Sequence, residues 1–118
     1  MVQFLKLKQV ADNVKQLFRD VVKVRTRIKD EQQVIQLLDA QVETIYVEQQ
    51  RIRLNVDSLD RTSELYQRYV KKLNAQEDQL EQIKEKRQVK TSSLLELAKT
   101  LRDLTGKEAA KDEVFGDS

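Results

Sequence analysis

The sequence contains no cysteine, no histidine and no proline, and it has only two glycines in 118 residues. Without cysteine the chain can form no disulfide framework and no thiolate metal site. Without histidine it also lacks the most common general base and most transition-metal ligand sets. No glycine-rich loop is present to hold a phosphate group. These absences predict a protein that is not an enzyme and that uses no cofactor.

Aromatic residues are also scarce, at 5% of the chain, and tryptophan is absent. A thick globular core needs more bulky apolar material than this, whereas a thin helical assembly can be built from Leu, Ile and Val. The chain is 36% charged and 39% hydrophobic, which is typical of long helices. Because the two glycines lie at positions 106 and 116, almost nothing before them interrupts a helix.

The charges are nearly balanced, with 22 basic and 20 acidic residues and a net charge of +2. This balance predicts against the broad electrostatic footprint of a nucleic-acid-binding protein. No stretch approaches the roughly 18 consecutive apolar residues of a membrane span, and the first residues lack the apolar core of a signal peptide. We therefore expect a soluble chain without a membrane span or an export signal, and the sequence indicates no compartment.

Apolar residues recur at spacings of three and four along two stretches of the chain. The first series is Leu7, Val10, Val14, Leu17, Val21, Val24, Ile28, Ile35, Leu38, Val42, Ile45, Ile52 and Val56. The second series is Tyr66, Tyr69, Leu73, Leu80, Ile83, Leu94, Leu97, Leu101 and Leu104. These spacings are the a and d positions of coiled-coil heptads. Each series predicts one long helix, so the expected fold class is all-α.

The stretch "NVDSLDRTS" separates the two series and is rich in Asn, Asp, Ser and Thr. Such residues favour caps and turns over helix interiors. The pattern predicts a helix over about 12–54, a turn over about 55–62 and a second helix over about 62–105. Asp57 or Asp60 is the expected N-cap of the second helix.

The ends of the chain carry weaker signals. Residues 1 to about 9 fit either a helix or an extended entry segment, with Asp12 or Asn13 as the N-cap in the second case. Gly106 is expected to end the second helix in the left-handed conformation that glycine adopts easily. Residues 107–118 are expected to form a flexible tail after a hairpin domain over residues 1–106.

A fold-back about Leu59 brings together residues whose numbers add up to 118, and we call this condition the sum rule. It places apolar residues of the two series opposite one another, for example Ile35 and Ile83. It also places Glu31, an acidic residue in the first seam, opposite Arg87, a basic residue in the second. The sequence therefore predicts a long antiparallel two-helix coiled-coil hairpin whose register is fixed by an ion pair between Glu31 and Arg87.

Further apolar residues flank the seam near the two ends of the chain. They either thicken the core of the hairpin itself or form an interface, and the wide apolar stripe favours an interface. The candidate self-association surface consists of Phe4, Ala11, Phe18, Val22, Leu95 and Ala98. We expect two hairpins to pair into a four-helix bundle, which makes a homodimer or a neighbouring domain of a longer protein the expected partner.

Two short basic runs, "KVRTRIK" and "KEKRQVK", come to the same level of the hairpin under the sum rule. The candidate anion belt consists of Lys23, Arg25, Arg27, Lys29, Lys84, Lys86 and Lys90. Acidic neighbours dilute these charges, so a solvated face with salt bridges is the favoured interpretation. A site for an acidic partner or a polyanion is the alternative.

The stretch from Glu48 to Ile83 resembles the C-terminal helical region of bacterial mucoidy-inhibitor-like proteins. The resemblance is carried by "RIRLN" and by "LYQRYVKKLNAQEDQL", with "RYV" at 68–70 and "QED" at 76–78. Larger members of that family have β-rich domains followed by such helices, and this chain lacks the β-rich part. The resemblance implies a structural module of bacterial origin and carries no site residues with it.

The sequence thus predicts a non-catalytic structural or assembly module that acts by self-association or by docking to a neighbouring domain. The main alternative is a binding module for an acidic partner or a polyanion through the candidate anion belt. A prefoldin-like chaperone that binds its clients at helical tips is a weaker alternative, because the expected tip offers only Val56 and Leu59 as exposed apolar residues.

Overall fold

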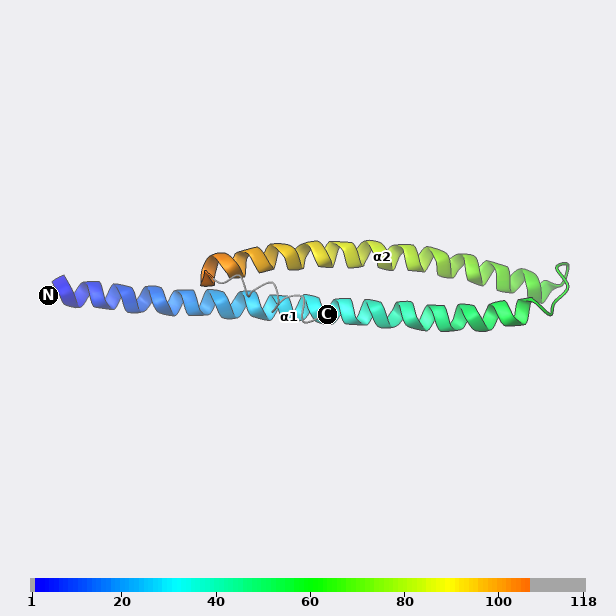
Figure 1. Cartoon of the computed structure of the whole chain (residues 1–118), viewed down its shortest axis with the longest axis horizontal. Helices are drawn as coiled ribbons and strands as arrows, with labels where there is room; N and C mark the ends of the chain where they lie inside the picture. Colours follow the sequence, from blue (N-terminus) through cyan, green and yellow to red (C-terminus); the bar gives the residue numbers. More distant parts are fainter. Residues whose placement is uncertain (1, 107–118) are drawn as a thin grey trace. The chain divides into compact units, whose positions relative to one another are not determined.

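The computed structural model describes residues 2–106 as two long helices joined by a turn (Figure 1). Helix α1 (Val2–Val56) has 55 residues and helix α2 (Glu64–Thr105) has 42. No strand occurs among these residues. The all-α helical hairpin expected from the heptad pattern is thus confirmed, and the tail expected at 107–118 lies outside the described residues.

The hairpin divides into two compact units. The turn unit spans Val34–Lys90 and contains the end of α1, the turn and the first part of α2. Within residues 2–106, the terminal unit consists of 2–33 and 91–106, and so contains the start of α1 and the end of α2.

Helix α1 begins at Val2, so an extended entry segment with an N-cap at Asp12 or Asn13 is a wrong expectation, and so is a helix start near residue 12. The first residues are mostly Leu, Lys, Gln and Val and include no glycine or proline. Extending an existing helix through such residues needs no new nucleus, and each added residue gains one backbone hydrogen bond.

The turn covers residues 57–63, and Ser63 is the N-cap of α2 instead of the expected Asp57 or Asp60. The Ser63 hydroxyl accepts a hydrogen bond of 3.1 Å from the backbone N–H of Tyr66, as an N-cap side chain does. Asp60 forms its hydrogen bonds inside the turn. Its carboxylate accepts bonds from the backbone N–H and the hydroxyl of Thr62 at 2.9 and 2.8 Å. These two bonds lower the pKa of Asp60.

Gly106 ends α2 as expected from the sequence. Its φ of 68° lies in the left-handed region that favours glycine. Its N–H donates a 2.6 Å hydrogen bond to the carbonyl of Arg102, the bond that closes an αL cap.

In the turn unit the two helices run antiparallel and side by side (Figure 1). The buried side chains of this unit are Leu38, Gln49, Ile52, Gln76 and Ile83. All five occupy a or d positions of the two heptad series, so the seam predicted from the sequence is the core of the unit.

The register of the turn unit differs from the sum rule. Arg87 Nε donates a 2.8 Å hydrogen bond to Asp39, for which the sum rule predicts position 79. Gln49 Nε2 donates a 3.1 Å bond to Glu77, where the sum rule predicts position 69. Both partners lie eight residues further along α2 than predicted, which is about one heptad. The predicted register of this unit is therefore wrong.

One further cross-helix contact, the salt bridge between Lys72 and Glu48, deviates from the sum rule by only two residues. A lysine side chain is long and flexible enough to reach along a helix, so this contact defines the register less closely than the shorter side chains do. The groove lined by both Val42 and Ile83 agrees with the displaced register.

The predicted register ion pair between Glu31 and Arg87 is corrected by the same observations, because Arg87 pairs with Asp39. A displacement by one heptad keeps every a and d position in the seam, so aliphatic residues alone do not select one register. A charge pair inside the seam would have cost desolvation, whereas Arg87 and Asp39 are each about half exposed and remain hydrated.

The core of the terminal unit is aliphatic. Its buried residues are Ile28, Leu94, Leu97, Ala98 and Leu101. The first turns of α1 project past the end of α2 within this unit (Figure 1). The sum rule pairs Leu17 with Leu101, yet Leu101 is buried while Leu17 is exposed. The predicted pairing is therefore wrong in this unit as well.

Candidate self-association surface

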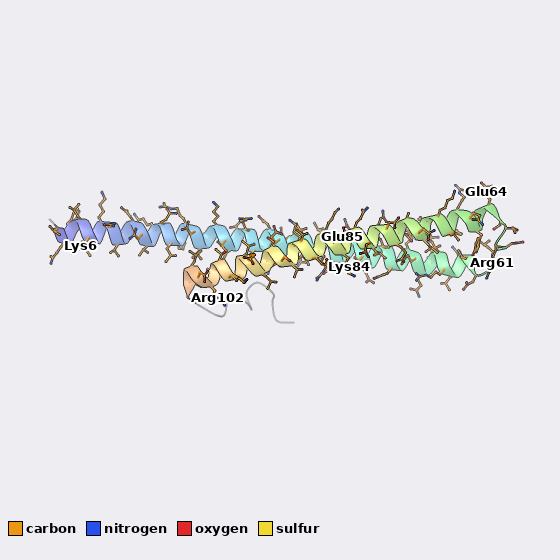
Figure 2. The ribbon with its side chains drawn as sticks, turned by 90° about the horizontal axis from the view of Figure 1, so that it is seen from above. Lys6, Arg61, Glu64, Lys84, Glu85 and Arg102 are labelled. Atoms are coloured by element: carbon orange, nitrogen blue, oxygen red, sulfur yellow. The ribbon has the colours of Figure 1, made fainter. Side chains whose placement is uncertain are left out.

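The projecting part of α1 leaves its heptad seam open to solvent. We call residues 2–20 the arm. The exposed fractions of its four seam residues are 69% for Leu7, 58% for Val10, 59% for Val14 and 43% for Leu17. In Figure 2 the side chain of Lys6 lies on the arm, well beyond Arg102 in the last turn of α2. The part of the chain that the structure describes thus leaves this seam uncovered.

Two rows of residues flank the open seam on the helix surface. Taking Leu7 as position a, the e row contains Phe4, Ala11 and Phe18, and the g row contains Lys6, Asn13 and Asp20. The e row is apolar and exposed, and it widens the apolar stripe on one side of the seam. The g row is polar, so the stripe has a distinct apolar edge and a distinct polar edge.

Five of the six residues of the candidate self-association surface predicted from the sequence are exposed, and one is buried. Phe4, Ala11, Phe18, Val22 and Leu95 are all exposed in the terminal unit. Ala98 is only 6% exposed and belongs to the core with Leu94 and Leu101, so its inclusion was wrong. Its position one residue after Leu97, on the side of α2 that faces α1, explains this burial.

The most extensive part of this surface, the seam residues of the arm, was not predicted from the sequence. These residues were assigned to the hairpin core because the sum rule placed α2 against them. Their exposure follows from where α2 ends, and no property of these residues by themselves distinguishes them from the buried seam residues further along α1.

The candidate anion belt was predicted from the sum rule, from which the helix contacts depart. Lys23, Arg25, Arg27 and Lys29 belong to the terminal unit, whereas Lys84, Lys86 and Lys90 belong to the turn unit. Only the sum rule brought these two groups to one level of the hairpin. Arg87, in the middle of the second basic run, is also engaged by the Asp39 carboxylate, which raises the pKa of Arg87 through a hydrogen bond.

The turn unit carries two open grooves along the helix pair. One is lined by residues that include Ile45, Gln79 and Gln82, and the other by residues that include Tyr46, Arg53 and Glu81. Their walls are largely long polar side chains, unlike the enclosed apolar pockets that bind small molecules. On the surface of the same unit, Glu48 accepts a hydrogen bond from Lys72, which lowers the pKa of Glu48.

Other kinds of site find no support in residues 2–106. These residues hold no group of three or more acidic side chains placed to bind a metal ion. Neither helix, over its described length, is apolar enough to cross a membrane. The arm therefore remains the most distinctive surface of the described chain.

No family model, curated protein or solved structure matches this chain. The resemblance of residues 48–83 to mucoidy-inhibitor-like proteins stays a prediction.

Proposed function

We propose that this chain is a non-catalytic assembly module and that it associates with itself through the arm. The observation that supports the proposal is the uncovered heptad seam formed by Leu7, Val10, Val14 and Leu17. An a/d seam is the surface that coiled-coil helices bury against one another, and a contiguous exposed apolar patch on a soluble domain usually marks an interaction site.

The rest of the chain supports an assembly role over a catalytic one. The sequence lacks histidine and cysteine, and most carboxylates and lysines of residues 2–106 lie at exposed helix positions. Exposed groups in water keep nearly ordinary reactivity, whereas catalytic groups are usually activated by burial or by a close partner. The module would therefore serve by holding copies of the chain together.

The experiment is a measurement of molar mass by light scattering from about 1 to about 100 μM. We expect the mass to rise from that of one chain to that of an oligomer, because the open seam is buried by mass action. Val14→Asp, which places a charge in the seam, is expected to hold the chain as a monomer while leaving the helical signal largely unchanged.

Leu54→Asp is the matched control, because Leu54 is equally exposed on α1 but lies at a heptad f position outside the seam. This variant should associate like the unmodified chain. A mass of one chain for the unmodified protein at all concentrations would overturn the proposal, and so would equal effects of the two substitutions.

A further inference from the structure

We propose that two arms bind each other antiparallel, around a two-fold axis near Asp12. This inference rests on the proposed function and specifies the partner and its orientation. In an antiparallel pair of helices each a position faces a d position of the other copy. Leu7 then faces Leu17 of the second copy, and Val10 faces Val14 of the second copy. Leucine meets leucine and valine meets valine, so the seam is complementary to itself, as a two-fold interface requires.

The apolar edge of the arm is self-complementary in the same arrangement. The e rows of the two copies lie next to each other, which places Phe4 beside Phe18 of the second copy. Ala11 meets Ala11 of the second copy near the axis. A small residue at the centre lets the helices approach closely, and a pair of phenylalanines on each side fills the space beyond it.

The polar edge is self-complementary as well. The g rows place Lys6 opposite Asp20 of the second copy, so the interface would contain this ion pair twice. Asp20 accepts a 3.0 Å hydrogen bond from Gln16 in the same helix, and a carboxylate has further acceptor sites for a lysine. Asn13 meets Asn13 of the second copy near the axis, where each amide can both donate and accept a hydrogen bond.

A parallel pair of arms would lose this matching. Parallel helices bring the g row of one copy against the e row of the other. Lys6 would then lie beside Ala11, and the Asn13 amide would lie beside the ring of Phe18. Polar groups would be covered by apolar ones without gaining partners, which is unfavourable. The distribution of residues on the two edges of the arm therefore favours the antiparallel orientation.

Single cysteines at positions 7 and 17 test the orientation directly, because the chain has no cysteine of its own. In the antiparallel pair, position 7 lies next to position 17 of the second copy. Two copies of position 7 are ten residues apart along the axis, or about 15 Å, which is too far for a disulfide. Leu7→Cys and Leu17→Cys should therefore cross-link when mixed under mild oxidation, and each alone should not.

Peptide mapping of the linked product identifies which cysteines have joined. A dimer in which each variant links to itself would overturn the antiparallel orientation and leave self-association standing. A monomer under all conditions would overturn both. A chain that is monomeric until residues 107–118 are removed would show that this segment occupies the arm, which would also overturn the inference.

A charge exchange tests the polar edge independently. Lys6→Asp should weaken the dimer about three- to tenfold at low salt, because it sets two like charges opposite each other at both ends of the interface. Lys6→Asp combined with Asp20→Lys should restore the dissociation constant. Lys8→Asp, at a position that points away from the second copy, is the matched control for net charge. Failure of the double exchange to restore binding would contradict the pairing.

Discussion

The arm and the turn unit carry the same heptad pattern, yet only the turn unit buries it. Hydrophobicity does not explain this contrast, because the exposed seam is the more apolar one. The seam of the arm contains only Leu and Val, whereas the seam of the turn unit contains Gln49 and Gln76. A glutamine is thus buried while the leucines of the arm face solvent. The comparison teaches that the opposite helix, and not the preference of the side chain itself, accounts for the burial of these seam residues.

The largest expected effect comes from truncating a covered seam leucine, Leu101 of the terminal unit, and comparing it with the same truncation of an uncovered one in the arm. Leu101→Ala should destabilise the chain by about 2–5 kcal/mol, because Leu101 is fully buried in the terminal unit. Leu7→Ala should change the free energy of unfolding by less than about 0.5 kcal/mol in dilute solution, because Leu7 is exposed in the single chain. Urea unfolding at about 1 μM measures both. Equal losses would mean that the arm is covered within one chain.

An intermediate effect is expected from the polar residues in the covered seam. The side-chain oxygen of Gln76 is buried and accepts no hydrogen bond. Gln76→Leu should raise the free energy of unfolding by about 1–3 kcal/mol, since it removes an unsatisfied acceptor from an apolar seam.

The matched control for this prediction is Gln79→Leu, the same substitution on the same helix at an exposed position. It should be neutral within about 0.5 kcal/mol. A Gln76→Leu variant that unfolds more easily than the unmodified chain would mean that the glutamine has a partner that stabilises it.

The smallest effect concerns the ion pair that replaces the one predicted from the sequence. Arg87 and Asp39 are about half exposed, and such pairs contribute at most about 1 kcal/mol. Arg87→Leu should therefore lower the free energy of unfolding by less than that amount, and the difference should shrink in 0.5 M salt. A loss of several kcal/mol would instead indicate a buried partner for Arg87 and would favour the original register.

Local features of the fold could be predicted well from the sequence. The scarcity of glycine and proline and the heptad spacing predicted two long helices, and Gly106 was correctly expected to end the second. The predicted bounds of the turn differ from the observed ones by only a residue or two. The N-cap of α2 was assigned to Asp57 or Asp60 instead of Ser63, because several residues of that stretch are good caps. Which of them caps α2 depends on the path of the chain between the helices.

The candidate surface could be predicted only in part. Phe4 and Phe18 were placed beside the seam from their e positions, and both are exposed, so they do not thicken the core of the hairpin. Leu7 to Leu17 were assigned to the core because the pairing of the two helices was inferred from matching residues alone. A shift by one heptad matches nearly as many apolar residues, so the sequence offered two registers of similar quality.

The sequence by itself determined that this chain forms two long helices with one apolar seam each, because helix propensity and the spacing of apolar residues are local properties. Only the tertiary structure decided how far the two seams overlap. That overlap depends on small differences between alternative registers, among them the hydration of Arg87 and Asp39 at the surface and the burial of two glutamines. Because α2 ends before it reaches the arm, the same choice of register left Leu7, Val10, Val14 and Leu17 exposed.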